Sequence, residues 1–260
     1  MTGSHTFRRI SRAFLLLFLT LPLGLMFVGC PGKNATKETG GTPVLELSLT
    51  VASLDLSNLN RRLTKADVSD LWNTLKSEKV EVLAVQNLTR YPGLATRTDF
   101  INELRALSDW RSAFGELVDN SGRQTGNAVF ASYPIRSHST VSFHKVKGAL
   151  FEGALHTVID GGVREIIVAS VVYPPKAGEK VRVECRSIVA EARGNHSAPM
   201  ILSGDNPAPG EGWEDVFRAG SPAGIQYDGA GAMRATSSRR VNVKLGSLSV
   251  VTFGLYRIQS

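Results

Sequence analysis

The sequence predicts an α/β sandwich, a domain in which strands pack together between helices. Two observations support this prediction. Segments with strand character follow one another through the middle of the chain, from residue 112 to residue 173. Segments with one apolar helical face flank that block on both sides. This order favours a sandwich over a doubly wound parallel sheet, in which strands and helices alternate throughout.

The first part of the predicted domain alternates strands and helices. Residues 44–54 alternate apolar and small polar side chains, and residues 80–85 are nearly all apolar, so both segments are predicted strands. Thr64, with Asp67 three residues later, predicts a helix start. Thr98 is predicted to cap a second helix. The apolar faces of these two helices consist of Val68, Leu71, Trp72 and Leu75, and of Phe100, Ile101, Leu104 and Leu107.

The rest of the chain continues this pattern. Further strands are predicted at residues 112–118, 127–132, 138–145, 149–159, 163–173 and 200–203. A helix is predicted near residues 179–193, and Cys185 on its apolar face is predicted to be core rather than a reactive thiol. A loop rich in Gly and Pro follows, including residues 220–231. Two last strands are predicted near 240–245 and 248–257, joined by a tight turn at residues 245–247.

The N-terminal segment predicts export. Arg8, Arg9 and Arg12 form a positive region without acidic residues, and residues 13–28 are an uncharged apolar run. This run is shorter than the ~20 residues that span a bilayer. Residues 27–30 (FVGC) resemble a lipobox, whose cysteine is acylated and becomes the new N-terminus. We therefore predict a lipoprotein signal peptide at 1–29, lipidation of Cys30, a flexible tether at 30–42 and a domain at 43–260. The alternative is an uncleaved transmembrane anchor.

This export prediction determines the expected location and partners. The domain is expected outside the cytoplasm, in the cell envelope or periplasm, and its membrane partner is reached through the lipid anchor. Removal of the signal lowers the formal net charge from +7 to +4. With no Lys/Arg run beyond Arg239–Arg240, that charge argues against a nucleic-acid partner. The sequence identifies neither a ligand nor an oligomeric state.

The cysteine count and the common motifs exclude several classes of protein. Only two cysteines occur, Cys30 and Cys185, which excludes a disulfide-stapled domain and a Cys-rich zinc site. The sequence contains no Walker A loop, no GxGxxG after a strand, no HExxH and no GxSxG motif.

Four segments carry a resemblance to a known family. They read VASLD at 51–55, VLAVQNL at 82–88, GNAVFASYPI at 126–135 and MILSGDN at 200–206. In this order they resemble the endonuclease/exonuclease/phosphatase superfamily, over nearly the whole chain after residue 43. The resemblance implies a four-layered α/β/β/α sandwich with two packed, largely antiparallel or mixed sheets. It places the site at one edge of those sheets.

The resemblance also implies a site whose functional residues are mostly replaced. In the family, a glutamate and an asparagine help to bind a divalent cation, usually magnesium. These positions fall on Asn87 and on Asp55. Asp205 stands where the family has an aspartate, and Asn206 follows it. The candidate metal-binding residues are therefore Asp55 and Asn87, and the candidate catalytic residues are Asp205 and Asn206. Asp55 as a simple strand-end cap is the competing interpretation.

The histidines of the family reaction have no counterpart. Two histidines position the phosphate, activate water and assist the leaving group, yet the family's thr-his pair falls on Ser170–Val171. Valine neither donates a hydrogen bond nor carries a proton. No Ser-Asp-His motif occurs in the C-terminal part, where the last histidine is His196. His138, His144 and His156 also fall outside the family's catalytic positions.

These replacements lead to a functional prediction with two rivals. We predict a cell-envelope lipoprotein with a degenerate domain of this family, a pseudoenzyme that serves as a non-catalytic binding or scaffolding module without a cofactor. The first rival is a metal-dependent phosphodiester or phosphomonoester hydrolase with an altered active site, which would use Asp55, Asn87, Asp205 and Asn206 around magnesium. The second is a purely structural envelope protein without a ligand.

Overall fold

The computed structural model describes residues 47–59, 61–94, 96–206, 213–215, 224–228, 234–245 and 249–259. The chain divides into two compact units, Met1–Pro43 and Val44–Ser260, and every described residue belongs to the second. The predicted signal peptide, Cys30, the tether and residues 246–247 of the predicted turn lie outside the described residues. Within the described part, no helix is long and apolar enough to cross a membrane.

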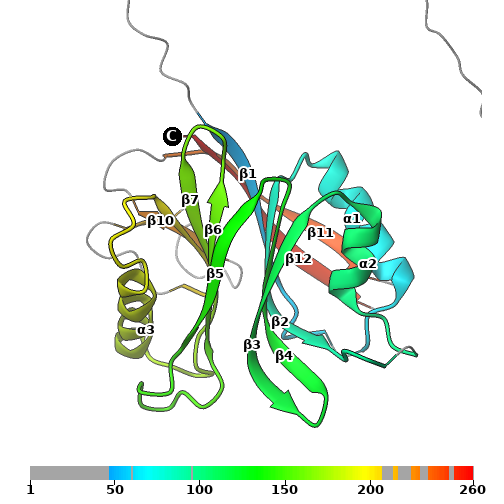
Figure 1. Ribbon diagram of the computed structural model, residues 1–260, viewed down its shortest axis with the longest axis horizontal. Helices are drawn as coiled ribbons and strands as arrows, with labels where there is room; N and C mark the ends of the chain where they lie inside the picture. Colours follow the sequence, from blue (N-terminus) through cyan, green and yellow to red (C-terminus); the bar gives the residue numbers. More distant parts are fainter. Residues whose placement is uncertain are drawn as a thin grey trace, which may run out of the picture. The chain divides into compact units, whose positions relative to one another are not determined.

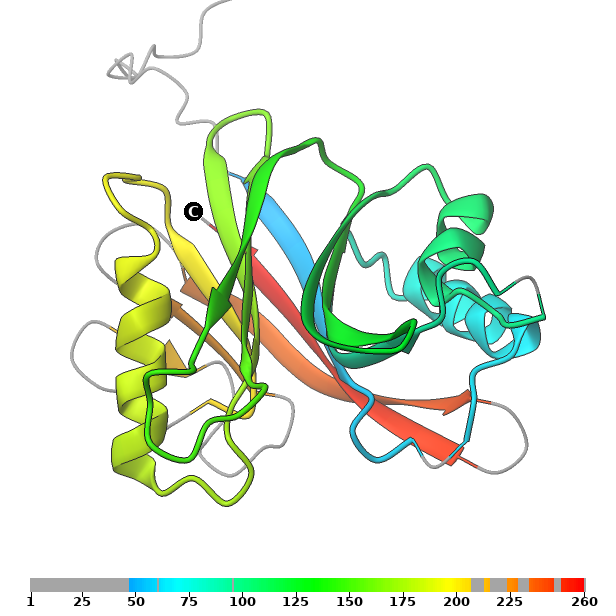
Figure 2. The same cartoon turned by 60° about the horizontal axis from the view of Figure 1, so that its bottom comes forward.

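Twelve strands and three helices make up the described part of the domain (Figures 1 and 2). The helices are α1 (Lys65–Ser77), α2 (Phe100–Leu107) and α3 (Glu179–Glu191). The strands are β1 (Ser48–Asp55), β2 (Val82–Arg90), β3 (Arg111–Asn120), β4 (Arg123–Ala131), β5 (Ile135–Ser142), β6 (Gly153–Asp160), β7 (Glu165–Val172), β8 (Met200–Gly204), β9 (Trp213–Asp215), β10 (Gly224–Asp228), β11 (Arg234–Leu245) and β12 (Ser249–Gln259).

The strands form two six-stranded mixed sheets. The first sheet has the order β11-β12-β1-β2-β4-β3, and the second has the order β5-β6-β7-β8-β10-β9. In each sheet one central pair is parallel, β1 with β2 and β7 with β8, while the other described pairs are antiparallel. Parallel neighbours need a crossover, which α1 and α3 provide. Each sheet therefore has a parallel pair of strands at its centre, flanked by antiparallel pairs.

Three apolar clusters define the layers. One cluster lies between the two sheets and joins Val51, Ala84 and Val129 of the first to Leu155 and Val168 of the second. The other two clusters lie on the outer faces, beneath α1 and α2 on the first sheet and beneath α3 on the second. This confirms the four-layered α/β/β/α sandwich.

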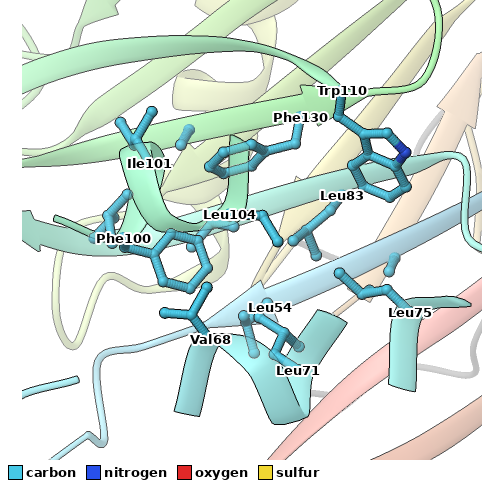
Figure 3. Close-up of a cluster of buried hydrophobic side chains, with 14 of the residues drawn as sticks. Leu54, Val68, Leu71, Leu75, Leu83, Phe100, Ile101, Leu104, Trp110 and Phe130 are labelled. Atoms are coloured by element: carbon cyan, nitrogen blue, oxygen red, sulfur yellow. The ribbon is translucent and has the colours of Figure 1, made fainter. Parts of the chain in front are cut away.

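The α1–α2 layer shows why these helices form where they do (Figure 3). Thr64 and Asp67 make the predicted capping box, in which the Thr64 hydroxyl accepts from the Asp67 backbone N–H and the Asp67 carboxylate accepts from the Thr64 N–H. The buried side chains of the layer come from both helices, from the strands beneath them and, for Trp110, from the loop between α2 and β3: Leu54, Val68, Leu71, Leu75, Leu83, Phe100, Ile101, Leu104, Trp110 and Phe130.

Two details of the second helix differ from the prediction. The N-cap is Asp99 rather than Thr98, because the Asp99 carboxylate accepts hydrogen bonds from the N–H groups of Ile101 and Asn102. Leu107, predicted on the apolar face, is the last residue of α2 and is 41% exposed.

The third helix confirms the interpretation of Cys185. Its side chain is fully buried in the cluster beneath α3, and burial raises the pKa of the thiol to about 11. A thiol with this pKa stays protonated near neutral pH, so Cys185 is a core residue.

Some strand predictions were wrong, since the predicted Gly- and Pro-rich loop also contains β9 and the strand predicted at 149–159 begins only at Gly153. The predicted loop at 220–231 contains β10, which pairs with β8 and buries Ile225, Gln226 and Tyr227. The four residues between Gly224 and Gly229 are too few for a periodic signal, so only the tertiary pairing defines this strand. The strand predicted at 138–145 ends at Ser142, after which residues 143–152 form a loop.

Candidate functional site

A buried polar network joins the four central strands, near the carboxyl ends of β1, β7 and β8 and at the middle of β2. It contains one side chain from each: Ser53 of β1, Gln86 of β2, Ser170 of β7 and Ser203 of β8. Gln86 is at its centre, since its Nε2 donates to Ser170 Oγ at 2.9 Å and to Ser203 Oγ at 3.0 Å. Its Oε1 accepts from Ser53 Oγ at 3.3 Å. The network therefore fixes the two sheets against each other at this edge.

Asn127 of β4 extends the network. Its Nδ2 donates to the carbonyl oxygens of Ser170 at 2.9 Å and of Gly153 at 3.2 Å. Its Oδ1 is buried and has no hydrogen-bond partner among the described residues. The neighbouring Gly126 is required by sterics, because a Cβ there would lie 2.0 Å from the Gly115 carbonyl oxygen on β3. Close packing and buried hydrogen bonds therefore explain Gly126 and Asn127 of the GNA sequence at residues 126–128.

A bulge in β2 sets the direction of the Asn87 side chain. The pairing of β2 with β4 shifts between Val85 and Leu88, so that Gln86 and Asn87 interrupt the ladder. Asn87 adopts a left-handed backbone conformation with φ of 56°. Asparagine tolerates this region better than most non-glycine residues. The bulge keeps Gln86 buried in the network and leaves Asn87 half-buried at its edge.

Asp55, the last residue of β1, and Asn87, in the bulge of β2, are brought together. Asn87 Nδ2 donates a hydrogen bond to Asp55 Oδ1 at 2.8 Å. The same carboxylate accepts from the Ser57 N–H at 2.9 Å and from Ser57 Oγ at 2.8 Å. Asp55 therefore closes a turn at the strand end, and both of its oxygens accept hydrogen bonds from the protein.

Asp205 and Asn206 follow β8 and have their own partners. Asp205 Oδ2 forms an ion pair with Arg182 of α3, with the Nη1 atom 2.7 Å away. Asn206 Oδ1 accepts from the Tyr173 hydroxyl at 2.9 Å, and its Nδ2 donates to the Leu202 carbonyl at 3.1 Å. The two candidate carboxylates, Asp55 and Asp205, are thus each held by a separate set of side chains.

Val171 stands where the resemblance places the histidine of the family's thr-his pair. It is 1% exposed and packs in the cluster beneath α3, on the opposite face of β7 from Ser170. The end of β8 lies close to it, because a Cβ on Gly204 would be 2.4 Å from the Val171 carbonyl oxygen. This position therefore contributes packing to the site edge and no ionisable group.

None of the histidines in the described part of the chain belongs to the buried polar network. His156 is buried on β6, and burial lowers its pKa, with His196 as a second cause. His196 lies before β8, with its Nδ1 3.8 Å from Glu165 at the start of β7. This is the opposite end of those strands from the polar network. His138 and His144 are exposed, and His144 contacts Ser142.

The donor set at Asp55 and Asn87 does not fit a magnesium ion as it is arranged. Mg²⁺ prefers hard oxygen ligands, with one or two carboxylates. Here the amide of Asn87 presents its N–H group, a donor, to the carboxylate that would share the cation. Within the described part of the chain, no three His, Cys, Asp or Glu side chains gather closely enough to hold a metal ion.

A pocket opens beside Asn87 that the sequence interpretation missed. Its volume is about 900 Å³, and it lies between the loop after β1, the end of β2, the loop before α2 and the β3–β4 turn. Four arginines line it: Arg61, Arg62, Arg97 and Arg123. The domain contains a second adjacent arginine pair besides Arg239–Arg240, namely Arg61–Arg62, so the prediction of no further Lys/Arg run was wrong. Arg61–Arg62 was the feature of the sequence that could have indicated this basic pocket.

Comparison with solved structures defines the fold family. An endonuclease/exonuclease/phosphatase from Bacteroides vulgatus aligns with a TM-score of 0.60 at 10% identity, covering 81% of this chain and 98% of that chain. A family protein from Leptotrichia buccalis gives 0.57 at 12% identity, with 80% and 98% coverage. This chain has the endonuclease/exonuclease/phosphatase fold.

A third neighbour comes from a human protein. The Nocturnin catalytic domain, solved with a bound sulfate anion, aligns with a TM-score of 0.59 at 12% identity, covering 81% of this chain and 93% of that chain. No family model and no curated protein matches the sequence. The relationship to the endonuclease/exonuclease/phosphatase proteins therefore lies in the fold.

Proposed function

We propose that this chain is a cell-envelope lipoprotein whose endonuclease/exonuclease/phosphatase-fold domain binds a ligand and does not catalyse metal-dependent hydrolysis. Residues 1–29 are the signal peptide, and Cys30 carries the lipid that anchors the domain to a membrane outside the cytoplasm. The site lies at the buried polar network, near the ends of β1, β7 and β8 and beside the bulge of β2.

The hydrogen bond from Asn87 to Asp55 carries the non-catalytic part of this proposal. In a metal site, the side chains at these two positions would both direct oxygens at the cation. Here the amide nitrogen donates to the carboxylate, and Ser57 donates to the same group. Arg182 forms an ion pair with the Asp205 carboxylate, the remaining acidic candidate. Each absent acid–base group would lower the rate by about 10²–10⁴-fold.

A hydrolysis assay tests the absence of catalysis. The full chain, purified in a nonionic detergent, is incubated with bis(p-nitrophenyl) phosphate and with p-nitrophenyl phosphate, in Mg²⁺ and in EDTA. We expect equal, background release of nitrophenol under both conditions. Release that requires Mg²⁺, is lost in Asp205→Ala and persists in the exposed control Asp119→Ala would establish instead an altered hydrolase that uses Asp55, Asn87, Asp205 and Asn206.

Lipid labelling tests the anchor. Cells that express the chain are grown with a labelled fatty acid, and the protein is recovered from the membrane fraction. We expect label on the wild-type chain, none on Cys30→Ser, and full label on the control Cys185→Ser, whose cysteine is buried. A mature chain that retains residues 1–29 and carries no label would support the transmembrane anchor in place of the lipoprotein.

A further inference from the structure

The pocket beside Asn87 has a strongly cationic lining. Besides its four arginines, the lining consists of neutral polar and apolar side chains: Leu56, Leu59, Leu63, Thr64, Asn87, Thr89, Tyr91, Thr96 and Thr98. No Asp or Glu occurs among the described lining residues. Because like charges repel in a shared cavity, such a lining favours internal partners or a bound anion wherever its guanidinium groups are withdrawn from water.

One of the four arginines has an internal partner. Arg61 makes a bidentate pair with the buried Asp67 carboxylate, with both N···O distances at 2.7 Å. Its Nη1 also donates to the Arg62 carbonyl oxygen at 2.8 Å. Arg61 is therefore a structural residue of the pocket wall, and the capping box of α1 holds Asp67 in place.

The other three arginines form no ion pair with a described acidic residue. Arg62 and Arg123 are exposed at the pocket rim. Arg97 is half-buried, and its guanidinium lies over the Tyr91 ring, 5.0 Å from the ring centroid. Its Nη1 atom is buried and has no hydrogen-bond partner among the described residues. A buried guanidinium N–H without an acceptor is costly, so this atom favours a ligand that supplies one.

We propose that this pocket binds a small anion carrying one or two phosphate groups, held by Arg62, Arg97 and Arg123 without a metal ion. This inference rests on the proposed binding function and names the chemical class of its ligand. Guanidinium groups match phosphate oxygens with paired N–H donors, and threonine hydroxyls at the wall add further donors. Asn87 links this pocket to the site edge, because it lines the pocket and also binds Asp55.

The pocket geometry favours a small anion over a nucleic-acid strand. A volume of about 900 Å³ lies within the usual range for small-molecule sites. Tyr91 is the one aromatic ring among the described lining residues, and the Arg97 guanidinium lies over it, whereas strand-binding surfaces offer aromatic faces to successive bases. A compact cluster of arginines without such a stacking face fits a phosphate-bearing small molecule better.

Calorimetric titration of pyrophosphate and inorganic phosphate tests the proposal. The full chain in a nonionic detergent is titrated in EDTA at constant ionic strength. We expect pyrophosphate to bind more tightly than phosphate, because it offers more oxygens to the three guanidinium groups. Arg97→Ala and Arg123→Ala should each weaken binding by about tenfold, the effect of one charge-assisted hydrogen bond. Arg97→Lys should give a smaller loss.

A matched control separates a local effect from the loss of one positive charge. Arg111 is exposed at the start of β3 and is not part of the pocket lining, so Arg111→Ala should leave the pyrophosphate affinity within about twofold. Thermal melting of each variant verifies that the domain remains folded. Equal losses in Arg111→Ala and Arg97→Ala would overturn the assignment to this pocket.

Three further outcomes would overturn the proposal. They are the absence of binding to the wild-type chain, binding that requires Mg²⁺, and tighter binding of single-stranded DNA that competes with pyrophosphate. The hydrolysis assay reports separately on catalysis. Absence of pyrophosphate binding without hydrolysis would therefore refute this ligand class and leave the proposed non-catalytic function standing. Metal-dependent hydrolysis together with pyrophosphate binding in EDTA would refute the non-catalytic function and leave the proposed phosphate-binding pocket standing.

Discussion

Gln86 Nε2 donates a hydrogen bond to Ser170 Oγ at 2.9 Å, across the interface between the two sheets. Ser170 Oγ in turn donates to the Val85 carbonyl oxygen at 2.9 Å. Both side chains are almost completely buried, so these contacts replace water at the edge where the candidate site lies. Buried polar groups stabilise a fold only while each keeps its partners, which makes Gln86 the residue on which the network depends.

Replacing Gln86 should destabilise the domain strongly. Gln86→Ala removes the acceptor of Ser53 and the donor to Ser170 and Ser203, and it opens a cavity between the sheets. We expect a loss of about 2–4 kcal/mol in the free energy of unfolding. Urea unfolding followed by tryptophan fluorescence measures it. Gln124→Ala, at a partly exposed β4 position, should cost less than about 1 kcal/mol. Equal unfolding midpoints for the two variants would contradict this account.

The Asp67 carboxylate should make stability depend on pH in the acid range. Hydrogen bonds from Arg61 hold the pKa of Asp67 below its ordinary value of 3.8, and Thr64 adds to this effect. Because the folded-state pKa is lowered, the stabilisation is fully present above pH 4 and is lost as pH falls through the folded value. At pH 7, Asp67→Ala should cost about 2–4 kcal/mol through loss of the cap and of the ion pair.

Unfolding at two pH values measures this effect. The difference in unfolding free energy between wild type and Asp67→Ala should shrink between pH 7 and pH 2.5. Asp70→Ala, an exposed change on the same helix, should show a small difference at both. A difference for Asp67→Ala that stays constant with pH would show that the carboxylate charge is not what stabilises α1.

Gly126 should not tolerate a side chain. A Cβ at this position would lie 2.0 Å from the Gly115 carbonyl oxygen, which is backbone and has no rotamer to move away. We expect Gly126→Ala to separate β3 from β4 and to cost more than about 3 kcal/mol. At the control position Gly178 a Cβ would meet nothing within 4 Å, so Gly178→Ala should cost less than about 1 kcal/mol. A folded Gly126→Ala protein with unchanged thermal stability would refute this requirement.

The parts of the fold that were predicted correctly are those encoded locally. The capping box needs only Thr64 and Asp67, three residues apart, and the apolar face of α1 follows from the helical period. The short strand β10 was missed because its identity depends on pairing with β8 rather than on its own sequence. The N-cap of α2 was placed one residue early because Thr98 and Asp99 are both good caps, and only the hydrogen bonds distinguish them.

The candidate site was only partly predictable, because it too depends on contacts between residues that are far apart in the sequence. The resemblance located Asp55, Asn87 and Asp205, but the sequence carries no information on which atoms of Asn87 and Asp55 face each other. The basic pocket escaped attention because its arginines come from three separate segments, at 61–62, 97 and 123. The Ser53–Ser203 contact joins residues 150 positions apart, at 2.6 Å, and depends on the packing of the two sheets.

Restoring a carboxylate at Asn87 should show whether the loss of this one charge is what removed metal binding. Asn87→Asp and Asn87→Glu place a second negative charge beside Asp55, now 2.8 Å from the Asn87 amide, and remove the hydrogen bond between them. In EDTA we expect both variants to lose about 1–3 kcal/mol of stability through charge repulsion. Asn87→Glu should lose more, because glutamate tolerates the left-handed backbone at φ of 56° less well than aspartate.

Thermal melting in EDTA and in Mg²⁺ measures both effects. Mg²⁺ should raise the melting temperature of Asn87→Asp and Asn87→Glu, because a dication relieves repulsion between two carboxylates, and it should leave the wild type unchanged. Asn87→Gln, which keeps a neutral amide, is the control and should not respond to Mg²⁺. A Mg²⁺ shift in the wild type would mean that the amide of Asn87 turns to present its oxygen to a cation, and the non-catalytic proposal would lose its main support.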